Sequence, residues 1–153
     1  IRPLENKKIP LYVKPFSNPT AEGSVITEHA APINVPVYIW RTNQVLITLR
    51  AKDFAFVLEE SLSHIFQIIH ANRLRVSLIQ SSAVTISVCV DNSRFVVKAI
   101  EQLQDAYRVT WNENLSLLTI RGTTPNILKQ EQQGRDILLS QLTRRTAKLV
   151  IKD

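Results

Sequence analysis

The chain contains little glycine, one cysteine and no methionine. Its 153 residues include three Gly, one Cys and no Met. Three glycines cannot build a glycine-rich loop that cradles phosphate groups, and a single cysteine excludes an internal disulfide. Cys/His metal-ligand spacings are also missing, so we expect these residues to bind neither a metal nor a cofactor. The absence of Met leads us to expect that they form part of a longer chain.

Long apolar runs and a leader are missing as well. No apolar run approaches the length of about 20 residues that a membrane-spanning helix needs. The first residues lack the charged, apolar and small-residue sequence of a secretory leader. A single cysteine fits a reducing compartment. We therefore expect a cytoplasmic protein without a membrane partner.

The basic charge is not concentrated. The net charge is +6 and the pI is near 9.8, values that also occur in nucleic-acid-binding domains. Acidic residues are interspersed among the basic ones, and no run of five like charges occurs. The pattern indicates a solvated surface, and we expect no nucleic-acid partner.

The rest of the chain is organised around residues 61–91. Four apolar residues at helical spacing predict an amphipathic helix: Leu62, Ile65, Phe66 and Ile69. Ser61 can cap the start of this helix, and Asn72 can end it because Asn tolerates the left-handed conformation.

Two strand-like runs follow this helix. Val76 and Leu78 alternate with polar residues, and the segment 80–83 is polar enough to form a turn. The second run places four apolar residues on one face: Val84, Ile86, Val88 and Val90. Cys89 lies on the opposite face, where we expect it to be packed rather than reactive.

A second helix and further strands complete a βαββαβ pattern. Ser93 can cap a helix with five apolar residues on one stripe: Val96, Ala99, Ile100, Leu103 and Tyr107. We predict strands at 36–41, 45–49, 108–111 and 115–121, with a connection at 42–44 and a turn at 112–114. This pattern predicts an α+β fold of the ferredoxin-like type. Helices pack on one face of an antiparallel sheet, and the other face is left for a partner or ligand.

The remainder repeats this pattern incompletely. Thr124 and Pro125 can open a helix that continues to Gln133 and stops at Gly134. Two strands at 137–142 and 147–152 follow, so the second unit lacks its second helix. Near the start we predict a short strand at 11–13, turns around 17–19 and 22–24, and a linker at 27–35. Residues 52–60 are predicted to form a loop with exposed Phe54 and Phe56.

No catalytic signature is present, but a small amino acid could bind near the first helix. The backbone N–H groups at its start can receive a carboxylate, and nearby oxygens can receive an ammonium group. The candidate effector-binding residues are Glu59, Glu60, Ser61, Leu62, Ser77, Gln80, Ser81 and Ser82. In the alternative interpretation, the serines and Gln80 only satisfy turn backbone groups, and the two glutamates only complement the helix dipole. His64 and His70 are expected to be ordinary helix-surface residues.

Several stretches resemble the C-terminal part of aspartate kinase. ENKKIPLYVKPFSNPTAEGSVI is similar to the last strand and loop of an amino-acid-kinase catalytic domain, and RTNQVLITL to the entry into the regulatory region. LSHIFQIIHANRLRVSLIQSSAVTISVCVD resembles the helix and hairpin of a first ACT domain, and YRVTWNENLSLLTIRG the strands that pass to a second one.

The resemblance implies a regulatory segment with tandem ACT domains. Residues 1–26 would be the tail of the catalytic domain and 27–35 a linker. Residues 43–112 would form the first ACT domain, and 36–42 with 113–153 a second, abbreviated one. The implied partners are a second copy in a homodimer, the kinase domain in the same chain, and lysine or threonine as effector. The parent enzyme would phosphorylate L-aspartate with MgATP.

Three positions depart from the family pattern. Ser77 stands where lysine-sensitive members often have Asp, Glu60 and Ser61 where Gly often precedes the helix, and Ser17 where many members have Lys. Two alternatives to a kinase regulatory segment also stay open. One is a stand-alone ACT-type amino-acid-binding protein, and the other is a basic RNA-binding βαββαβ domain.

Overall fold

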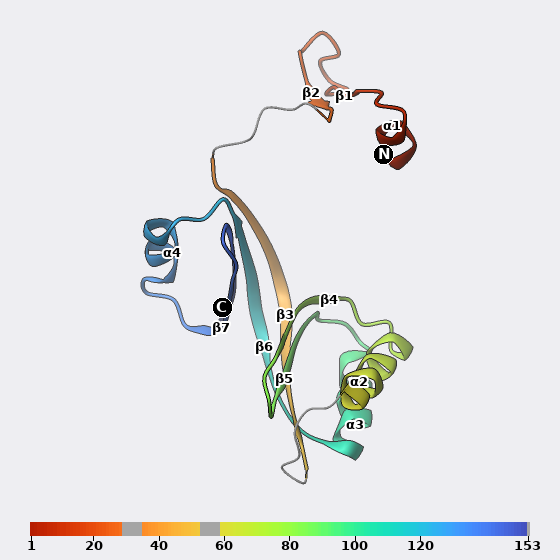
Figure 1. The fold of residues 1–153 in the computed structure, drawn as a ribbon, viewed down its shortest axis with the longest axis vertical. Helices are drawn as coiled ribbons and strands as arrows, with labels where there is room; N and C mark the ends of the chain where they lie inside the picture. The colour runs from red at the N-terminus through yellow and green to blue at the C-terminus, as the bar shows by residue number, and fades with distance from the viewer. Residues whose placement is uncertain (29–34, 53–58, 153) are drawn as a thin grey trace. The chain divides into compact units, whose positions relative to one another are not determined.

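The computed structural model describes residues 1–28, 35–52 and 59–152, apart from the side chain of Glu59. The chain divides into two compact units, residues 1–34 and 35–153 (Figure 1). No helix in the described part is long and apolar enough to cross a membrane.

The first unit is small and has no core of its own. It contains α1 (Arg2–Asn6) and a two-stranded antiparallel sheet of β1 (Leu11–Val13) and β2 (Ser24–Ile26). Gly23 precedes β2 with φ +71°, and a Cβ there would meet the carbonyl oxygen of Val13. The predicted strand at 11–13 is confirmed, whereas α1 was not predicted. None of the residues described in 1–28 is buried.

In its described residues the second unit contains one six-stranded sheet and three helices. The strands are β3 (Val37–Ala51), β4 (Val76–Ser81), β5 (Ile86–Asp91), β6 (Tyr107–Arg121), β7 (Ile137–Leu142) and β8 (Thr146–Lys152). The helices are α2 (Glu59–Ala71), α3 (Val96–Ala106) and α4 (Pro125–Gln132). The strand order is β4-β5-β3-β6-β8-β7, and every neighbouring pair is antiparallel.

Most predicted elements are confirmed, and so is the α+β class. The stripe of α3 is buried at Val96, Ala99, Ile100 and Leu103, whereas Tyr107, predicted as its last member, is the first residue of β6. In α4 the Thr124 side chain accepts from the N–H of Ile127, and Pro125 occupies the first turn, as predicted. In β5 the face with Ile86, Val88 and Val90 is buried against the helices, although Val84 lies before the strand and is exposed. The predicted loop at 52–60 and linker at 27–35 lie partly outside the described residues.

The connection at 42–44 and the turn at 112–114 were predicted wrongly. β3 and β6 each run unbroken through these segments and pair with each other along their length. Register shifts mark a β-bulge on each strand, and Asn43 and Asn114 have φ near +55°. Asn tolerates this left-handed conformation, so the polar segments accommodate bulges instead of turns.

The bulges divide the sheet into two halves with a common pattern. The first half-sheet comprises β4, β5, residues 44–51 and residues 107–112. The second half-sheet comprises β7, β8, residues 115–121 and residues 37–41. Each residue n of β3 corresponds to residue n + 71 in the second long strand. Five of these pairs are identical: Trp40/Trp111, Asn43/Asn114, Leu46/Leu117, Thr48/Thr119 and Arg50/Arg121. Sequence analysis predicted an incomplete repeat of the pattern but missed this residue-by-residue correspondence.

Each bulge inserts one residue, which reverses the alternation of faces along its strand. All three helices therefore pack on one face of the continuous sheet. The helices α2 and α3 cover a cluster that includes Ile47, Val88 and Leu103, and α4 covers one that includes Leu118, Ile120 and Leu149. This confirms the predicted placement of helices on one face.

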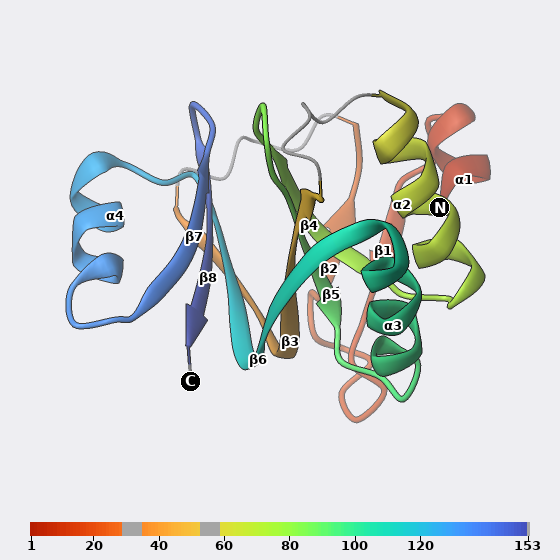
Figure 2. The ribbon, with the colours of Figure 1, turned by 90° about the horizontal axis from the view of Figure 1, so that it is seen from below.

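The opposite face is not left free, which corrects the sequence-based expectation. The sheet curls so that its two halves face each other, with helices on both outer sides (Figure 2). The inner cluster consists of Leu46, Leu78, Cys89, Leu115, Leu117 and Val150, with Leu139 packed against it. Burial of this apolar face by the other half of the sheet stabilises both halves. It also removes most of the surface on which an RNA-binding domain of this topology would stack bases.

Candidate functional site

The start of α2 holds the first group of predicted effector-binding residues. Glu60 is exposed, whereas Ser61 and Leu62 are half-buried. The Tyr107 hydroxyl donates to the Ser61 carbonyl oxygen over 3.3 Å and lies 3.1 Å from Nδ1 of His64. Burial raises the pKa of the Tyr107 phenol above its ordinary value, and the Ser61 side chain lowers it in part. Tyr107 therefore ties the first turn of α2 to the beginning of β6.

A cavity lies beneath this helix end, but it is very small. Its lining includes Ser61, Ile65, Ile86 and Tyr107, and its volume is about 10 Å³. A volume of roughly 10–15 Å³ holds a single water molecule. An amino acid could therefore bind at this end only after the site opens.

The remaining predicted residues lie on β4 and in the turn that follows it. Residues directly opposite each other on paired strands share a face. Ser81 is opposite Ile86, so it lies on the helix face, whereas Gln80 is opposite Ser87 on the inner face. Ser77 also points to the inner face, where its hydroxyl donates to Asp91. Ser77 and Ser81 are about 13 Å apart along the strand. The structure therefore divides the predicted set into a helix-end group and an inner-face group.

Ser82 has a structural role in the turn between β4 and β5. Its Oγ lies 2.7 Å from the Thr85 hydroxyl and accepts from the N–H groups of Val84 and Thr85. These bonds match the alternative interpretation, in which a turn serine satisfies backbone donors.

A polar cluster centred on Asp91 lies at the inner-face edge of the bulge. Gln44, which is buried, donates to Asp91 Oδ1 over 2.9 Å and to the Thr42 carbonyl over 3.1 Å. Arg41 Nη1 lies 3.7 Å from the same carboxylate oxygen and donates to Ser77 Oγ over 3.3 Å. Because Arg41 belongs to the second half-sheet and Asp91 to the first, the cluster links the two halves. Of its members, sequence analysis identified only Ser77, although the acidic end of an apolar strand was a usable signal.

Cys89 packs beside this cluster. Its thiol is 3.7 Å from Oε1 of Gln44. Burial raises the pKa of the Cys89 thiol to about 11, with a further contribution from the Asp91 carboxylate. The Cys89 side chain is fully buried in the inner cluster, which confirms the prediction that it is packed.

Two long side chains of the second half-sheet reach the edge of β4. Lys148 Nζ donates to the Ser77 carbonyl over 3.2 Å, and Gln141 Nε2 donates to the Ile79 carbonyl over 3.0 Å. They satisfy carbonyl groups at an edge that no strand covers in the described residues. The inner face is thus closed by polar contacts as well as by the apolar cluster.

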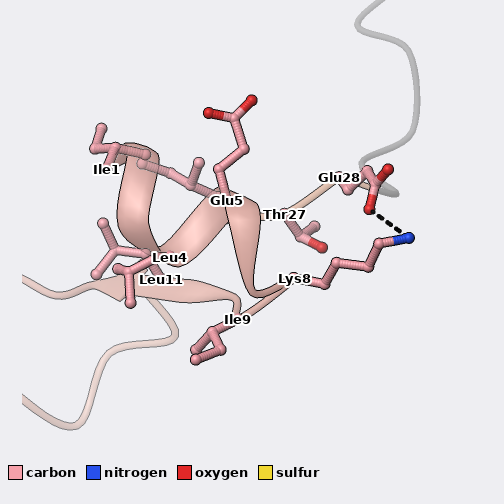
Figure 3. Close-up of a pocket in the computed structure, with 9 residues that line it drawn as sticks. Ile1, Leu4, Glu5, Lys8, Ile9, Leu11, Thr27 and Glu28 are labelled. Carbon is pink, nitrogen blue, oxygen red and sulfur yellow. Dashed lines mark ion pairs between the residues drawn. The ribbon is translucent and has the colours of Figure 1, made fainter.

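The first unit carries a pocket of its own (Figure 3). Its volume is about 280 Å³, and its apolar lining consists of Ile1, Leu4, Ile9, Leu11 and Ile26. At its rim Lys8 Nζ lies 3.6 Å from Oε2 of Glu28. None of the predicted effector-binding residues lines this pocket. Across the described residues, no group of three His, Cys, Asp or Glu side chains is arranged to hold a metal ion.

Solved structures of other proteins share the fold of this chain. The chain matches Escherichia coli aspartokinase III in complex with lysine and aspartate with a TM-score of 0.75 at 18% identity, over 99% of this chain. It matches Clostridium acetobutylicum aspartate kinase with a TM-score of 0.75 at 14% identity, also over 99% of this chain. A C-terminal regulatory domain of aspartate kinase from Porphyromonas gingivalis matches over 78% of this chain and 88% of its own length, with a TM-score of 0.63 and 14% identity.

The chain spans 37% and 40% of the two longer proteins. No family model and no curated protein sequence matches it. The resemblance to aspartate kinase that the sequence motifs indicate agrees with these matches between solved structures and the fold of the chain.

Proposed function

We propose that the chain is the regulatory segment of an aspartate kinase, which senses a small amino acid and pairs with a second copy. The observation that carries this proposal is the extent of the structural likeness, which includes residues outside the six-stranded sheet and reaches 99% of the chain. The parent enzyme would be a cytoplasmic phosphotransferase that uses MgATP to phosphorylate L-aspartate.

The proposed domain division follows the two half-sheets. Residues 43–112 correspond to a first ACT domain, and residues 36–42 with 113–153 to a second, abbreviated one. Residues 1–26 are proposed as the tail of the catalytic domain and 27–35 as a linker. Apolar side chains of the first unit are exposed and bury no core of their own. This supports its assignment as the tail of a larger domain that would cover them: Ile9, Tyr12, Val13, Phe16, Val25 and Ile26.

The effector site is proposed at the start of α2. The N–H groups near Ser61 and Leu62 would receive the α-carboxylate of lysine or threonine, and the Glu60 carboxylate with the Ser81 hydroxyl would face the ammonium group. Ser77 and Gln80 would take part from the inner face of the sheet and not contact the ligand at the start of α2. On that face Ser77 contacts the Asp91 cluster. Binding at the helix end would open the small cavity under Ser61 and so disturb the Tyr107 contact.

Thermal unfolding with millimolar lysine, threonine and methionine tests this proposal. A ligand at 100 times its Kd adds ~2.7 kcal/mol. For a chain of this size the midpoint should rise by roughly 5–15 °C. Stabilisation by one amino acid alone would identify the effector. If none of the three shifts the midpoint, the sensing function is wrong for these residues.

A matched pair of variants locates the site. Glu60→Gln removes a carboxylate at the start of α2 and should weaken binding about tenfold or more, as expected for a charge-assisted hydrogen bond. Glu101→Gln removes an exposed carboxylate from α3 and should leave the affinity unchanged. Equal effects of the two variants would contradict the proposed position.

A further inference from the structure

The two parts of the internal repeat differ in charge. Residues 43–112 hold seven Lys and Arg against six Asp and Glu, a net charge of +1. Residues 36–42 with 113–153 hold eight against four, which is +4 of the +6 of the whole chain. This excess is scattered along the sequence, but the hairpin of β7 and β8 gathers part of it at one end of the second half-sheet.

The turn of this hairpin repeats the turn between β4 and β5. In the second hairpin the N–H of Thr143 donates to the Thr146 carbonyl over 2.8 Å, and the N–H of Thr146 donates to Thr143 Oγ1 over 3.2 Å. In the first hairpin the N–H of Ser82 donates to the Thr85 carbonyl over 2.8 Å, and the N–H of Thr85 donates to Ser82 Oγ over 3.1 Å. The two turns therefore share one hydrogen-bond pattern.

The two residues at the tip of each turn differ in kind. The first turn carries Ala83 and Val84, whereas the second carries Arg144 and Arg145, and all four are exposed. We call residues 143–146 the arginine turn. Because the same hydroxyl contacts close the first turn around Ala and Val, the turn conformation does not require arginine. The fold therefore gives no reason for the two guanidinium groups.

A third guanidinium group lies beside the arginine turn. Arg121, the last residue of β6, is exposed and pairs with Thr146 on the neighbouring strand, about 4.8 Å away. The two residues after Arg121 donate their N–H groups to the Arg145 carbonyl over 2.7 and 3.1 Å. In the first half-sheet Arg50 holds the corresponding place, beside a turn that carries no charge.

None of these three arginines forms an ion pair with a described residue. Elsewhere in the second unit, Arg41 and Arg135 lie within ion-pair distance of Asp91 and Glu131. Like charges that gather without a counter-charge repel one another and destabilise the folded state. The arginine turn and Arg121 thus form an uncompensated basic surface at the end of the second half-sheet.

We propose that this surface binds a carboxylate-rich segment of a partner protein. A guanidinium group is a planar fork that holds a carboxylate by two parallel hydrogen bonds, which suits arginine better than lysine to this task. Three such groups around one turn match two or three neighbouring carboxylates. Binding would also relieve the repulsion among the arginines. The surface lies apart from the start of α2, so the proposal does not depend on amino-acid sensing there.

The surroundings of the arginine turn favour a protein segment over a nucleic acid. Single-stranded nucleic acids stack their bases on aromatic side chains. Leu142, which precedes the turn, is 54% exposed, and Tyr38 lies three strands away from it, at about 14 Å. The Trp40 ring is covered by the guanidinium group of Arg135, 5.1 Å from its centre. The arginine turn is therefore flanked by an aliphatic contact and not by a stacking platform.

The basic surface is also short. Lys148, the next basic residue along β8, donates to the Ser77 carbonyl over 3.2 Å. Lys152 lies six residues from Thr146, about 20 Å along the strand. A single-stranded nucleic acid follows a basic groove over at least about four nucleotides. Three arginines at one turn fit a few adjacent carboxylates instead.

Fluorescence anisotropy of the full chain tests this proposal with a labelled peptide of six glutamates and one leucine at low salt. Arg144→Ala with Arg145→Val copies the first turn and should raise the peptide Kd at least tenfold. Arg75→Gln with Lys98→Gln removes the same charge from exposed positions elsewhere and should alter the Kd less than threefold. Equal weakening by the two double variants would mean that net charge alone attracts the peptide, and would overturn the proposal.

A variant that fails to fold does not end the test. If Arg144→Ala with Arg145→Val loses its circular dichroism spectrum, Arg144→Gln with Arg145→Gln replaces it and should also raise the Kd at least tenfold. A hexauridine RNA should bind the wild-type chain at least fivefold more weakly than the peptide. RNA that binds as tightly as the peptide, or no peptide binding at millimolar concentration, would contradict a protein partner.

Amide chemical shifts of the wild-type chain locate the contact. Addition of the peptide should move the amide signals of residues 121–123 and 143–146 and leave those of the equivalent turn, residues 82–85, in place. Equal movement of both turns, or movement confined to the start of α2, would overturn the proposal. The shift of the unfolding midpoint by amino acids is measured separately, and the arginine variants should leave it unchanged. Failure of either proposal is thus distinguishable from failure of the other.

Discussion

The side-chain amide of Gln44 donates to the carboxylate of Asp91 over 2.9 Å, although the corresponding position in the internal repeat is occupied by Leu115. Among the described residues, the buried polar side chains are those of Gln44, Asn72 and Ser116. The same side chain reaches the Thr42 carbonyl and lies near the Cys89 thiol. One residue thus supports both the bulge of β3 and the carboxylate that links the two half-sheets.

We expect Gln44→Leu to lower the free energy of unfolding by about 1–3 kcal/mol, because a carboxylate loses a buried hydrogen-bond donor. Urea denaturation measures the loss. Replacing both partners, in Gln44→Leu with Asp91→Val, should cost less than the sum of the two single substitutions. Strict additivity would indicate that the two side chains do not interact in solution.

The bulges at Asn43 and Asn114 predict that alanine at the two positions lowers the stability to different extents. Asn43 and Asn114 have the same positive φ, but only the Asn43 side chain accepts a hydrogen bond, from Nδ2 of Asn92 over 3.1 Å. Alanine at either position should cost about 1 kcal/mol from backbone strain, with a further loss of up to about 1 kcal/mol at Asn43. Glycine tolerates a positive φ, so Asn114→Gly should be close to neutral. Equal losses for the two alanine variants would argue against the side-chain bond.

The raised pKa of Cys89, about 11 against an ordinary 9.0, predicts slow alkylation of the thiol and a loss of folding stability at alkaline pH. At pH 8 roughly 0.1% of the thiol is ionised, so alkylation by iodoacetamide should be far slower than in the unfolded chain. Because the folded state holds this proton more tightly, the contribution to stability is complete below pH 9 and is lost as the pH rises toward 11. Cys89→Ala should remove that part of the alkaline loss, and an unchanged profile would contradict the assignment.

Sequence reasoning predicted elements with local signals and missed those that depend on distant pairing. The stripe of α3 and the Thr124 cap of α4 are encoded within a few residues, and both are confirmed. The segments 42–44 and 112–114 are polar and turn-like by themselves. They form bulges because the flanking strands pair with each other over a long separation in sequence.

The Asp91 cluster could be predicted only in part, for a similar reason. Arg41, Gln44 and Asp91 are far apart in sequence, and their meeting depends on the curl of the sheet. The division of Ser77 from Ser81 depends on the register shift in β4 between Val76 and Leu78, which no local pattern indicates.

The course of β3 and β6 has a consequence for how the molecule could be shortened. Gln44 of β3 pairs with Leu115 of β6. The chain therefore leaves the second half-sheet after residue 41 and returns to it at residue 115, beside the point where it left. The first half-sheet with α2 and α3 is therefore an insertion within a hairpin. Excising it and joining the two strands there by a short Asn-Gly turn would leave a contiguous miniature of α4 and four strands. The first half-sheet, residues 44–112, is by contrast one continuous segment, so truncation at both ends isolates it without any new junction.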